Sequence, residues 1–501
     1  MDEGKINDRT PGRKKYIVLG CASVLYWLLS FYLERFVFAP GTAEQHPFTY
    51  ISVKLLTLGT IFALALFFYN ALTGLRRRTE AAQTLLYFLP VFVCVTAFWA
   101  VCHSYPIQYG DQLNILDSAI YYSNMGGFFN YLTTYIPMIA MNIIPSGAFA
   151  VIFKIFLISL AAGYCVCRVR RLTSSWLAFL LYFPFLVPPG LYLSENIHRC
   201  PMYAVLYMLF SCVLLCDHLE KRSLTRGKFV VLSFMAAALT QWRSEGIYLL
   251  LLSPVLLYLA YRPRLTAGRK AMVTALMLAV QLIVFVPQKL ETGAAAGGAS
   301  ERALPLFEYL ITNMERKGLD KVKNAEELAI VDRYVSVDAI HALNEQNGDY
   351  NYNDNLIIYH GLRKDATQAD KDEFKAAVIR LVLKNPGVYL RTQLGAWAYI
   401  STERLSDRRL DVISNIFQDL FIPTAWLIAV WIYSLARKDW LVWFLTSGHL
   451  CHMAITTLLL PAAYFKYFYS EYLYAFLTLT LLLPIFLKGR KNQQKAAESL
   501  Y

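Results

Sequence analysis

The stretch TLLYFLPVFVCVTAFWAVC, residues 84–102, decides the fold of this chain, and it runs directly into HSYPIQYGDQLNILDSAIYY, residues 103–122. The first part is an uninterrupted apolar run of the length that crosses the hydrocarbon core of a bilayer, about 30 Å. The second part is where acidic, amide and aromatic residues first gather outside such a run. Together they predict a membrane helix that delivers the chain to a polar surface segment.

A helical pattern opens at Asp111, directly after the flexible joint Gly110, with Asn114 and Asp117 at successive steps of three residues. Such a helix would float at a membrane surface and turn its polar side chains towards whatever lies above it. The alternative is that Asp111 serves only as the N-cap of this helix. The apolar face of the helix is expected to hold Leu113, Leu116 and Ile120.

The composition indicates an all-α polytopic membrane protein. Of the 501 residues, 57% are hydrophobic and only 17% are charged, whereas a soluble protein carries about a quarter charged residues. The net charge of +13 lies largely in short loops between apolar runs, where it sets orientation, and this placement argues against a nucleic-acid partner. The nine cysteines form no CxxC pair and no disulfide framework.

The order of apolar runs and basic loops predicts about twelve spans, with both termini cytoplasmic in the plasma (inner) membrane. Every loop assigned to the inner side is basic, as the positive-inside rule requires. The expected spans cover residues 16–38, 51–72, 84–102, 148–166, 176–188, 201–216, 229–241, 246–261, 272–286, 416–435, 441–460 and 467–486.

Three parts follow from this layout. Residues 1–288 form an N-terminal transmembrane module whose first outer loop covers residues 103–145. Residues 289–400 form a small, mostly helical extracytoplasmic insertion that ends by returning along the membrane surface. Residues 401–501 supply the C-terminal membrane helices.

Several charged residues lie where hydropathy does not explain them, and charge at membrane depth is costly unless it is paired or hydrated. Lys154 falls inside an expected span, so it either pairs with an acid or faces a hydrated cavity, and we favour the pairing over a role in ligand binding. Glu34 and Arg35 are expected to pair with each other, and His449 and His452 to make polar contacts between helices. On the outer side we single out Glu195, His198 and Arg199 in one loop, Arg243 and Glu245 at a helix joint, and Lys466 before the last span.

Structural alternatives apply to the outer residues. Arg243 and Glu245 could form an ion pair that satisfies only itself, and Lys466 could extend its ammonium to the interface along the membrane surface. The two outer histidines, His103 and His198, have no HxxH or HxxxE neighbour, so no metal ligands are predicted.

The order of these features resembles the GT-C superfamily of integral membrane glycosyltransferases. The resemblance rests on the basic N-terminus, the aspartate that opens an interfacial helix in the first outer loop, the entry HRCPMYAVLYMLF at residues 198–210, the joint WRSEG at residues 242–246, and an outer domain before the last spans. The chain is most similar to bacterial members related to protein O-mannosyltransferases and lipid A aminoarabinose transferase.

The resemblance implies a catalytic base and leaves the cofactor open. An aspartate of the first large outer loop is the base in that family, and it maps to Asp111. Many members have an adjacent second acid, whereas this chain has Gln112, which leaves Asp117 as the nearest substitute. No cofactor is therefore certain, and a divalent metal stays an open alternative. Arg243 matches a position where such enzymes often carry an arginine.

The implied reaction moves a hexosyl or pentosyl group from a polyprenyl-phosphate donor to a lipid, glycan or protein acceptor in the cell envelope. Tyr109 and Asn114 would hold Asp111, and Arg199, Arg243 or Lys466 would stabilise the departing phosphate. Two other classes stay open: a polysaccharide polymerase or ligase, which shares lipid-linked substrates, and a secondary transporter, which should show matching halves and broken helices.

Overall fold

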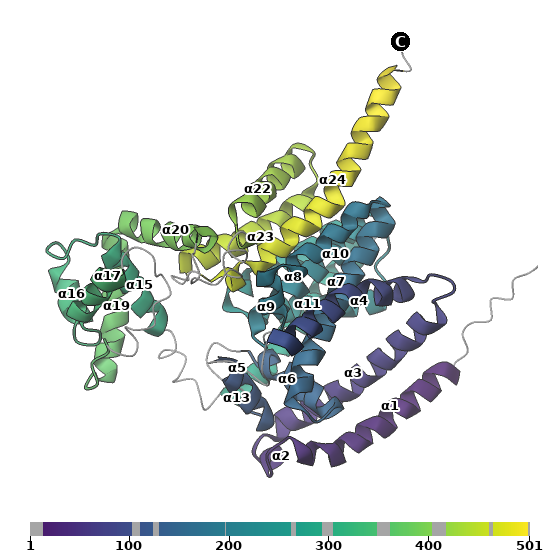
Figure 1. Cartoon of the computed structure of the whole chain (residues 1–501), viewed down its shortest axis with the longest axis horizontal. Helices are drawn as coiled ribbons and strands as arrows, with labels where there is room; N and C mark the ends of the chain where they lie inside the picture. The colour runs from purple at the N-terminus through teal and green to yellow at the C-terminus, as the bar shows by residue number, and fades with distance from the viewer. Residues whose placement is uncertain are drawn as a thin grey trace, which may run out of the picture. The chain divides into compact units, whose positions relative to one another are not determined.

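The computed structural model describes residues 14–102, 111–123, 130–195, 197–261, 267–292, 304–347, 361–402, 417–459 and 464–498. Within these ranges the chain is helical, as Figure 1 shows, and no strand forms apart from a single bridge between Val335 and Leu362. The prediction of an all-α protein is confirmed.

The helices follow one another in chain order. Their bounds are α1 (Lys14–Leu33), η1 (Glu34–Phe36), α2 (Thr42–Gln45), α3 (Pro47–Thr73), α4 (Glu80–Cys102), α5 (Asp111–Ile120), α6 (Leu132–Ile143), α7 (Gly147–Thr173), η2 (Trp176–Tyr182), α8 (Phe183–Leu186), α9 (Pro188–Glu195), α10 (Arg199–Leu219), α11 (Arg226–Trp242), η3 (Ser244–Tyr248), α12 (Leu249–Tyr261), α13 (Ala267–Thr292), α15 (Leu304–Arg316), α16 (Ala325–Val331), α17 (Val337–Asn347), α19 (Gln368–Lys384), α20 (Pro386–Thr402), α22 (Phe421–Ala436), α23 (Trp440–Leu459), η6 (Phe465–Tyr467) and α24 (Tyr469–Glu498).

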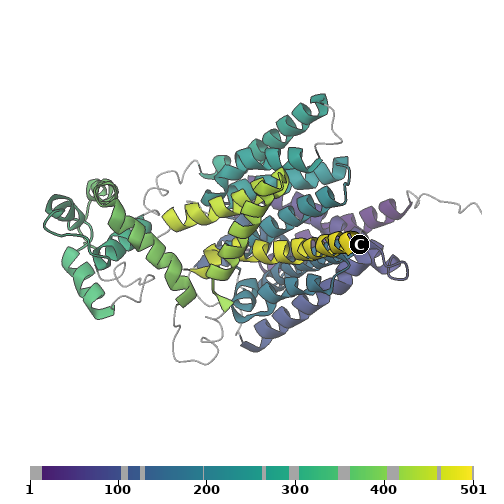
Figure 2. The same cartoon turned by 90° about the horizontal axis from the view of Figure 1, so that it is seen from above.

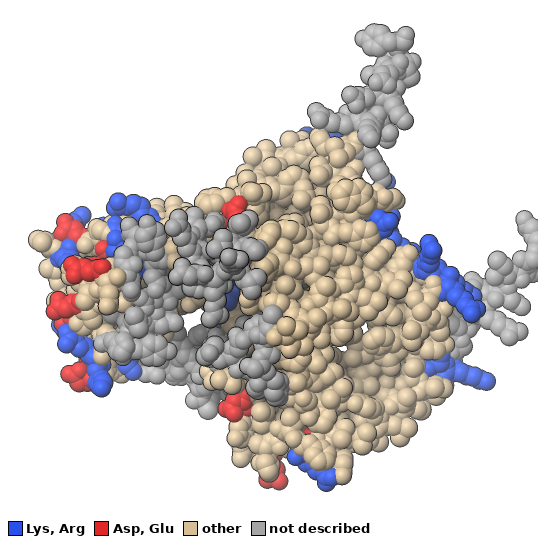
Figure 3. All heavy atoms as spheres, in the orientation of Figure 1, with Lys and Arg blue, Asp and Glu red and all other residues tan. Residues whose placement is uncertain are grey.

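Seven helices in the described ranges are long and apolar enough to cross a membrane, and a bent pair would make an eighth. The bent pair joins 176–186 to 188–195 at an angle of 66°. The surface over the bundle helices in Figure 3 carries almost no charged side chains. The seven spans lie in Lys14–Phe36, Pro47–Thr73, Glu80–Val101, Gly147–Thr173, Arg199–Leu219, Trp440–Leu459 and Tyr469–Leu487.

The predicted number of twelve spans is therefore not confirmed, although the polytopic helical class is. Three of the expected spans fall on shorter apolar stretches, Glu245–Tyr261, Phe421–Ala436 and Ala271–Leu282, the last of which is part of the longer helix α13. A helix rises 1.5 Å per residue, so a 16-residue helix covers only about 24 Å and does not cross about 30 Å of hydrocarbon alone. Hydropathy marks these segments as apolar but does not give the length of the helix that forms.

The described chain divides into two compact units. Unit 1 comprises residues 1–125, 131–167 and 194–198, and unit 2 comprises residues 126–130, 168–193 and 199–501. In unit 1, α3 packs against α1, α4 and α6, and α5 packs against α6. In unit 2, α10 packs against α24, α11 and α12, and α23 packs against α22 and α12. The boundaries predicted at residues 288 and 400 stay predictions.

One end of unit 2 is tied together by a buried ion cluster around Asp217. This carboxylate, at the end of α10, accepts from Arg168 at 3.0 Å, from Lys228 at the start of α11, and from the hydroxyl of Tyr261 at the end of α12. Arg168 also bonds Glu220 at 2.7 Å. A buried charge is tolerated only when it is paired and hydrogen-bonded, so this cluster fixes how α10, α11 and α12 meet.

The described part of the insertion, residues 304–347 and 361–402, has an apolar core of its own. Phe374, Val378 and Leu381 from one face of α19 meet Ile311 and Met314 of α15, and all five are buried. Each substitution of a core side chain of this size by alanine typically costs about 2–5 kcal/mol. The insertion is thus a folded helical element, as its charged helical pattern predicts.

One acid, Glu308, is buried beside this core and makes the stability of the insertion depend on pH. The hydroxyl of Tyr334 donates to one oxygen of Glu308 at 2.9 Å, and the other oxygen has no hydrogen-bond partner among the described residues. Burial raises the pKa of Glu308, and the Tyr334 hydrogen bond only partly opposes this. The unfolded chain therefore loses this proton at a lower pH than the folded chain does.

We expect the stability of the insertion to fall as the pH rises from the ordinary pKa of a glutamate to the raised value, because the unfolded state binds fewer protons there. Glu308→Gln should reduce this fall, since the amide does not titrate. The measurement is the protection of α15 amides against hydrogen exchange, corrected for intrinsic rates, in the whole protein. An unchanged pH slope in the variant would show that Glu308 does not titrate differently in the two states.

Candidate functional site

The predicted surface helix of the first outer loop is present as α5, which begins at Asp111. Asn114 and Asp117 are exposed, as expected for its polar face. Tyr109 and the side chain of Asp111 lie outside the described residues. The predicted apolar face is partly wrong: Leu116 is buried, but Leu113 is exposed, and the other fully buried positions are Ile115 and Ala119.

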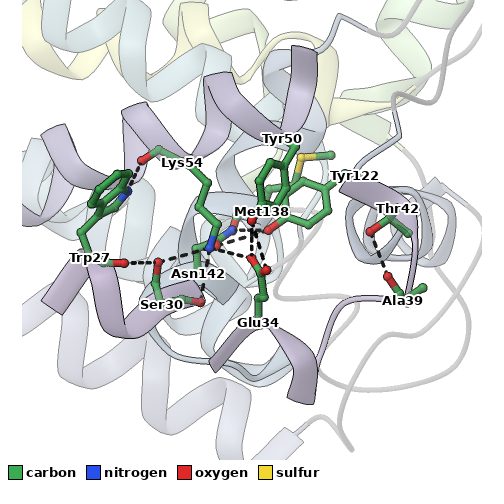
Figure 4. A network of polar contacts seen from close by, with 10 residues as sticks. All are labelled: Trp27, Ser30, Glu34, Ala39, Thr42, Tyr50, Lys54, Tyr122, Met138 and Asn142. Carbon is green, nitrogen blue, oxygen red and sulfur yellow. Dashed lines mark hydrogen bonds and ion pairs between the residues drawn. The ribbon is translucent and has the colours of Figure 1, made fainter. Parts of the chain in front are cut away.

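A buried ion pair in unit 1 holds the end of this loop (Figure 4). Lys54, on α3, lies 2.7 Å from a carboxylate oxygen of Glu34, in η1, and also donates to the hydroxyl of Ser30 at 3.2 Å. The hydroxyl of Tyr50 donates to the same carboxylate at 3.1 Å, and the indole of Trp27 donates to the carbonyl of Lys54 at 2.7 Å. These interactions join Lys54 to α1 and η1 and hold α1 and α3 side by side. We call them the Glu34–Lys54 lock.

The end of α5 is attached to this lock. Tyr122 stacks on Phe38 at 4.3 Å between ring centroids and meets Tyr50 edge-on at 5.1 Å. The amide of Asn142, on α6, donates to the Tyr122 hydroxyl at 3.0 Å (Figure 4). The backbone of Ala39 also bonds the carbonyl of Ile120 at 3.1 Å. These contacts position the helix that begins at Asp111.

Two predictions about single charges have different outcomes. The expected pairing of Glu34 with Arg35 is wrong, because Glu34 pairs with Lys54 and the guanidinium of Arg35 lies 3.5 Å from the ring of Tyr32. Lys154 is buried on α7, and its charge acts on the carboxylate of Glu195, which agrees with the expected pairing to an acid. His198 is buried in the same unit.

The joint between α11 and α12 in unit 2 presents a buried arginine. Arg243 has an extended backbone (φ −131°, ψ 142°), and its guanidinium forms an ion pair with Glu245 and donates to the sulfur of Cys200. The joint turns so tightly that a Cβ at Gly246 would lie 2.2 Å from the carbonyl oxygen of Leu239, so only glycine fits at this position. Burial would raise the pKa of Glu245, but the Arg243 guanidinium outweighs it and lowers that pKa to about 2. The ion pair predicted as the structural alternative to a binding role is thus present.

Two further cations lie beside this pair. Arg199 begins α10, is buried, and is close enough to Arg243 and Glu245 to interact electrostatically with both. The ring of Tyr467 lies 5.0 Å from the guanidinium of Arg243 and 5.3 Å from the ammonium of Lys466. The structure therefore brings together four residues from three segments that are far apart in sequence, and we name them the cation cluster: Arg199, Arg243, Glu245 and Lys466.

The cation cluster holds three positive charges and one negative charge. Arg199 and Arg243 repel each other, and both are buried, with exposed fractions of 9% and 2%. Guanidinium groups suit bidentate recognition of phosphate or carboxylate. A bound anion would offset the repulsion between the guanidinium groups of Arg199 and Arg243, so the cluster has the chemistry of an anion-binding site.

An apolar groove lies near the same end of unit 2. Its cavity volume is about 210 Å³, and Tyr472, which lines it, packs on Phe465 at 5.2 Å between ring centroids, directly beside Lys466. The other lining residues are Phe183, Phe417, Asp419, Ile422, Pro423, Trp426, Ala475, Phe476 and Leu479.

A buried histidine–glutamate pair is the main feature that the sequence did not indicate. His452, on α23, hydrogen-bonds Glu471, on α24, at 2.8 Å, and its ring stacks on Tyr203 at 5.4 Å. His449 is held between Tyr207 and Tyr474, each at 3.8 Å between centroids. The histidines make polar contacts between helices, as expected. However, the partner of His452 lies 19 residues away, which no local spacing reveals.

Comparison with known proteins adds no relative. No protein-family model, curated protein or solved structure matches the chain. In the part of the chain that the structure describes, no three His, Cys, Asp or Glu side chains gather in a way that could hold a metal ion. The arguments about function therefore rest on the residues themselves.

We expect Glu34→Gln to destabilise unit 1 by about 2 kcal/mol, because it leaves the buried Lys54 ammonium without its counter-charge. Replacing both residues, as Glu34→Gln with Lys54→Met, should be less damaging than Glu34→Gln alone, since the uncompensated charge is then absent. The measurements are thermal unfolding of the purified protein and hydrogen exchange of the α5 amides. Glu44→Gln, which changes an exposed acid of α2, is the control; an equal effect of both single variants would contradict the lock.

Proposed function

We propose that this chain is an integral membrane glycosyltransferase that moves a sugar from a polyprenyl-phosphate donor to an acceptor hydroxyl at the extracytoplasmic face of the membrane. The observation that carries the proposal is the cation cluster, in which two buried guanidinium groups lie beside a single acid and the Lys466 ammonium lies near the Tyr467 ring that Arg243 also approaches. This charge pattern suits the phosphate of such a donor, whose negative charge grows as the sugar leaves.

The groove supports a lipid-linked anion over a soluble one. Polyprenyl chains are apolar, and one residue of the groove, Tyr472, contacts Phe465, the residue before Lys466. A donor with its phosphate at the cation cluster and its chain along the groove would bury both its charged and its apolar part in unit 2.

The transfer would proceed by attack of the acceptor oxygen on the anomeric carbon of the sugar. The bond from that carbon to the phosphate oxygen breaks, and the electron pair stays on the phosphate, where Arg199 and Arg243 stabilise it. The acceptor proton passes to a general base. The resemblance to the GT-C superfamily implies Asp111 for that role, and the Glu34–Lys54 lock holds the helix that begins at Asp111 within unit 1.

Orientation is supported by the distribution of basic residues. Arg199, Arg243 and Lys466 are buried or half-buried, whereas Lys221 and Arg222 lie in the connection between α10 and α11, and Arg437 and Lys438 lie between α22 and α23. Basic connections favour the cytoplasmic side. This distribution supports our proposal that the cation cluster lies at the extracytoplasmic end of the helices and that both termini lie in the cytoplasm of a plasma-membrane protein.

One observation favours a second candidate, a proton-coupled transporter. His452 and Glu471 form a buried titratable pair between two membrane helices, a feature common in proton relays. A transporter of this kind would move its substrate without breaking a sugar–phosphate bond. Release of polyprenyl phosphate from a labelled donor by the purified protein separates the two candidates.

The first test concerns the phosphate. Arg243→Gln should weaken binding of a short-chain polyprenyl phosphate about tenfold to a hundredfold, the value of a charge-assisted contact. Glu245→Gln should be milder, because it removes no positive charge. Arg226→Gln, an exposed arginine at the other end of the same helix α11, should have no effect.

The measurement is native mass spectrometry of the purified protein with the lipid, expressed per folded molecule. If Arg243→Gln and Glu245→Gln lower the yield of folded protein equally and leave binding per folded molecule unchanged, the ion pair is structural only and the proposal fails.

The second test concerns the base. Asp111→Asn should fold and still bind the lipid, because asparagine caps a helix as well as aspartate does. Sugar transfer in a reconstituted assay should fall about 10²- to 10⁴-fold, because the amide does not accept the proton. Asp117→Asn, which changes an exposed acid of the same helix, should be less damaging. Near-normal turnover of the Asp111→Asn protein would leave Asp111 as an N-cap.

A further inference from the structure

The last part of the insertion forms a sharp elbow of two helices. α19 and α20 are separated only by Asn385, and in Figure 1 and Figure 2 α20 runs from the insertion helices towards α22 and α23. We call residues 368–402 the elbow. All of it belongs to unit 2.

The elbow is rigidly held. Its first helix begins with a capping box, in which the Thr367 hydroxyl accepts from the backbone of Asp370 while the Asp370 carboxylate accepts from the backbone of Thr367. The side-chain amide of Asn385 donates to the side chain of Asn324 and to the carbonyl of Leu381, each at 2.9 Å. The exposed side chains of the elbow are therefore presented in a fixed arrangement.

Each helix of the elbow carries two exposed apolar side chains on one face, and we call these four side chains the ridge. Leu383 on α19 is 74% exposed and Leu394 on α20 is 56% exposed. Ile379 lies four residues before Leu383, and Leu390 lies four residues before Leu394, so each pair shares one face of its helix. The opposite face of α19 is already used by the core of the insertion. The ridge is thus a second apolar face that no part of the described chain covers.

Positive charge flanks the ridge. Arg380 and Arg391 are exposed beside it, one on each helix. The exposed acids of α19, Asp372 and Glu373, lie in its first two turns, at the end distant from the bend. This distribution, with apolar side chains between cations, is typical of helices that lie in the interface of a membrane with anionic headgroups.

The elbow is attached to the end of a membrane helix. The side-chain amide of Gln393 donates to the carbonyl of Leu458 at 3.0 Å, and the hydroxyl of Tyr389 donates to the same carbonyl. Leu458 is the penultimate residue of α23, one of the candidate spans. α20 therefore lies at the level where that span ends, which is the boundary between hydrocarbon and headgroups.

An aromatic contact marks the same boundary. The indole of Trp397, on α20, packs edge-on against Phe421 at 4.8 Å between centroids. Trp is enriched at membrane interfaces, where one part of the ring is apolar and the other is wet. Phe421 starts α22, so the C-terminal half of the elbow is continuous with the apolar helices of unit 2.

We propose that the elbow lies in the membrane interface, with the ridge Ile379, Leu383, Leu390 and Leu394 inserted among the lipids and Arg380 and Arg391 against anionic headgroups. A bilayer is the occupant that these contacts favour, because α20 is bonded to the end of a span and the ridge extends outward from that point. The elbow would then hold the insertion against the membrane at the end of unit 2 where the cation cluster lies.

The test uses a genetically encoded photo-crosslinking residue at Leu383 and, separately, at Leu394, in the full chain in nanodiscs. Val322, which is 89% exposed in the same insertion but outside the elbow, is the matched control. We expect lipid adducts, detected by mass spectrometry, at both ridge positions and at least about fivefold less at Val322. Arg380→Ala with Arg391→Ala should lower adduct formation with anionic lipids several-fold, because each cation near such a surface favours binding.

Each other outcome would overturn the proposal. Adducts to a second copy of the chain would make the ridge a dimer contact, and adducts to another protein in whole cells would make it a partner site. Equal lipid adduct yields at Leu383, Leu394 and Val322 would show that the ridge has no particular contact with lipid. The crosslinker replaces exposed side chains, and the thermal unfolding temperature of each variant confirms that the insertion is folded.

Discussion

Buried charge among apolar helices is the constraint on which this structure depends. Each buried ionic group needs an opposite charge and hydrogen bonds nearby, since its own hydration is lost. At one end of unit 2, Asp217 and Glu220 offset the charges of Arg168 and Lys228. At the other end, Arg199 and Arg243 lie beside a single carboxylate, Glu245, and Lys466 lies near the ring of Tyr467 that Arg243 also approaches. We propose that a bound anion offsets the positive charge of this second end.

Unit 1 also pairs its buried charge within the protein, and there the ion pair joins two membrane helices to the outer loop. The ion pair of Lys54 with Glu34 joins the first two spans, and the aromatic contacts of Tyr122 attach the outer-loop helix to that pair. A single polar network thus connects the membrane helices to the helix that begins at Asp111 (Figure 4). The same device that stabilises the helix packing also positions the residue proposed as the base.

The sequence predicted the features that depend on local spacing. The helical class, the basic connections, the surface helix starting at Asp111 and the Arg243–Glu245 pair all follow from residues close together in the chain. Other contacts depend on how the helices pack. Lys54 lies 20 residues from Glu34, and the sequence pattern wrongly indicated Arg35 as the partner of that carboxylate. Glu471 lies 19 residues from His452, and the sequence did not indicate this pair. The number of spans also depends on where helices end, which hydropathy does not give.

The central claim is that the cation cluster binds the phosphate of a lipid-linked sugar donor. A cryo-EM structure of the protein in nanodiscs with a short-chain polyprenyl phosphate tests it most directly. The account predicts phosphate density in contact with the guanidinium groups of Arg199 and Arg243, and chain density along the groove lined by Phe183, Trp426 and Tyr472. Phosphate density at the opposite end of unit 2, beside Arg168 and Lys228, would contradict the account.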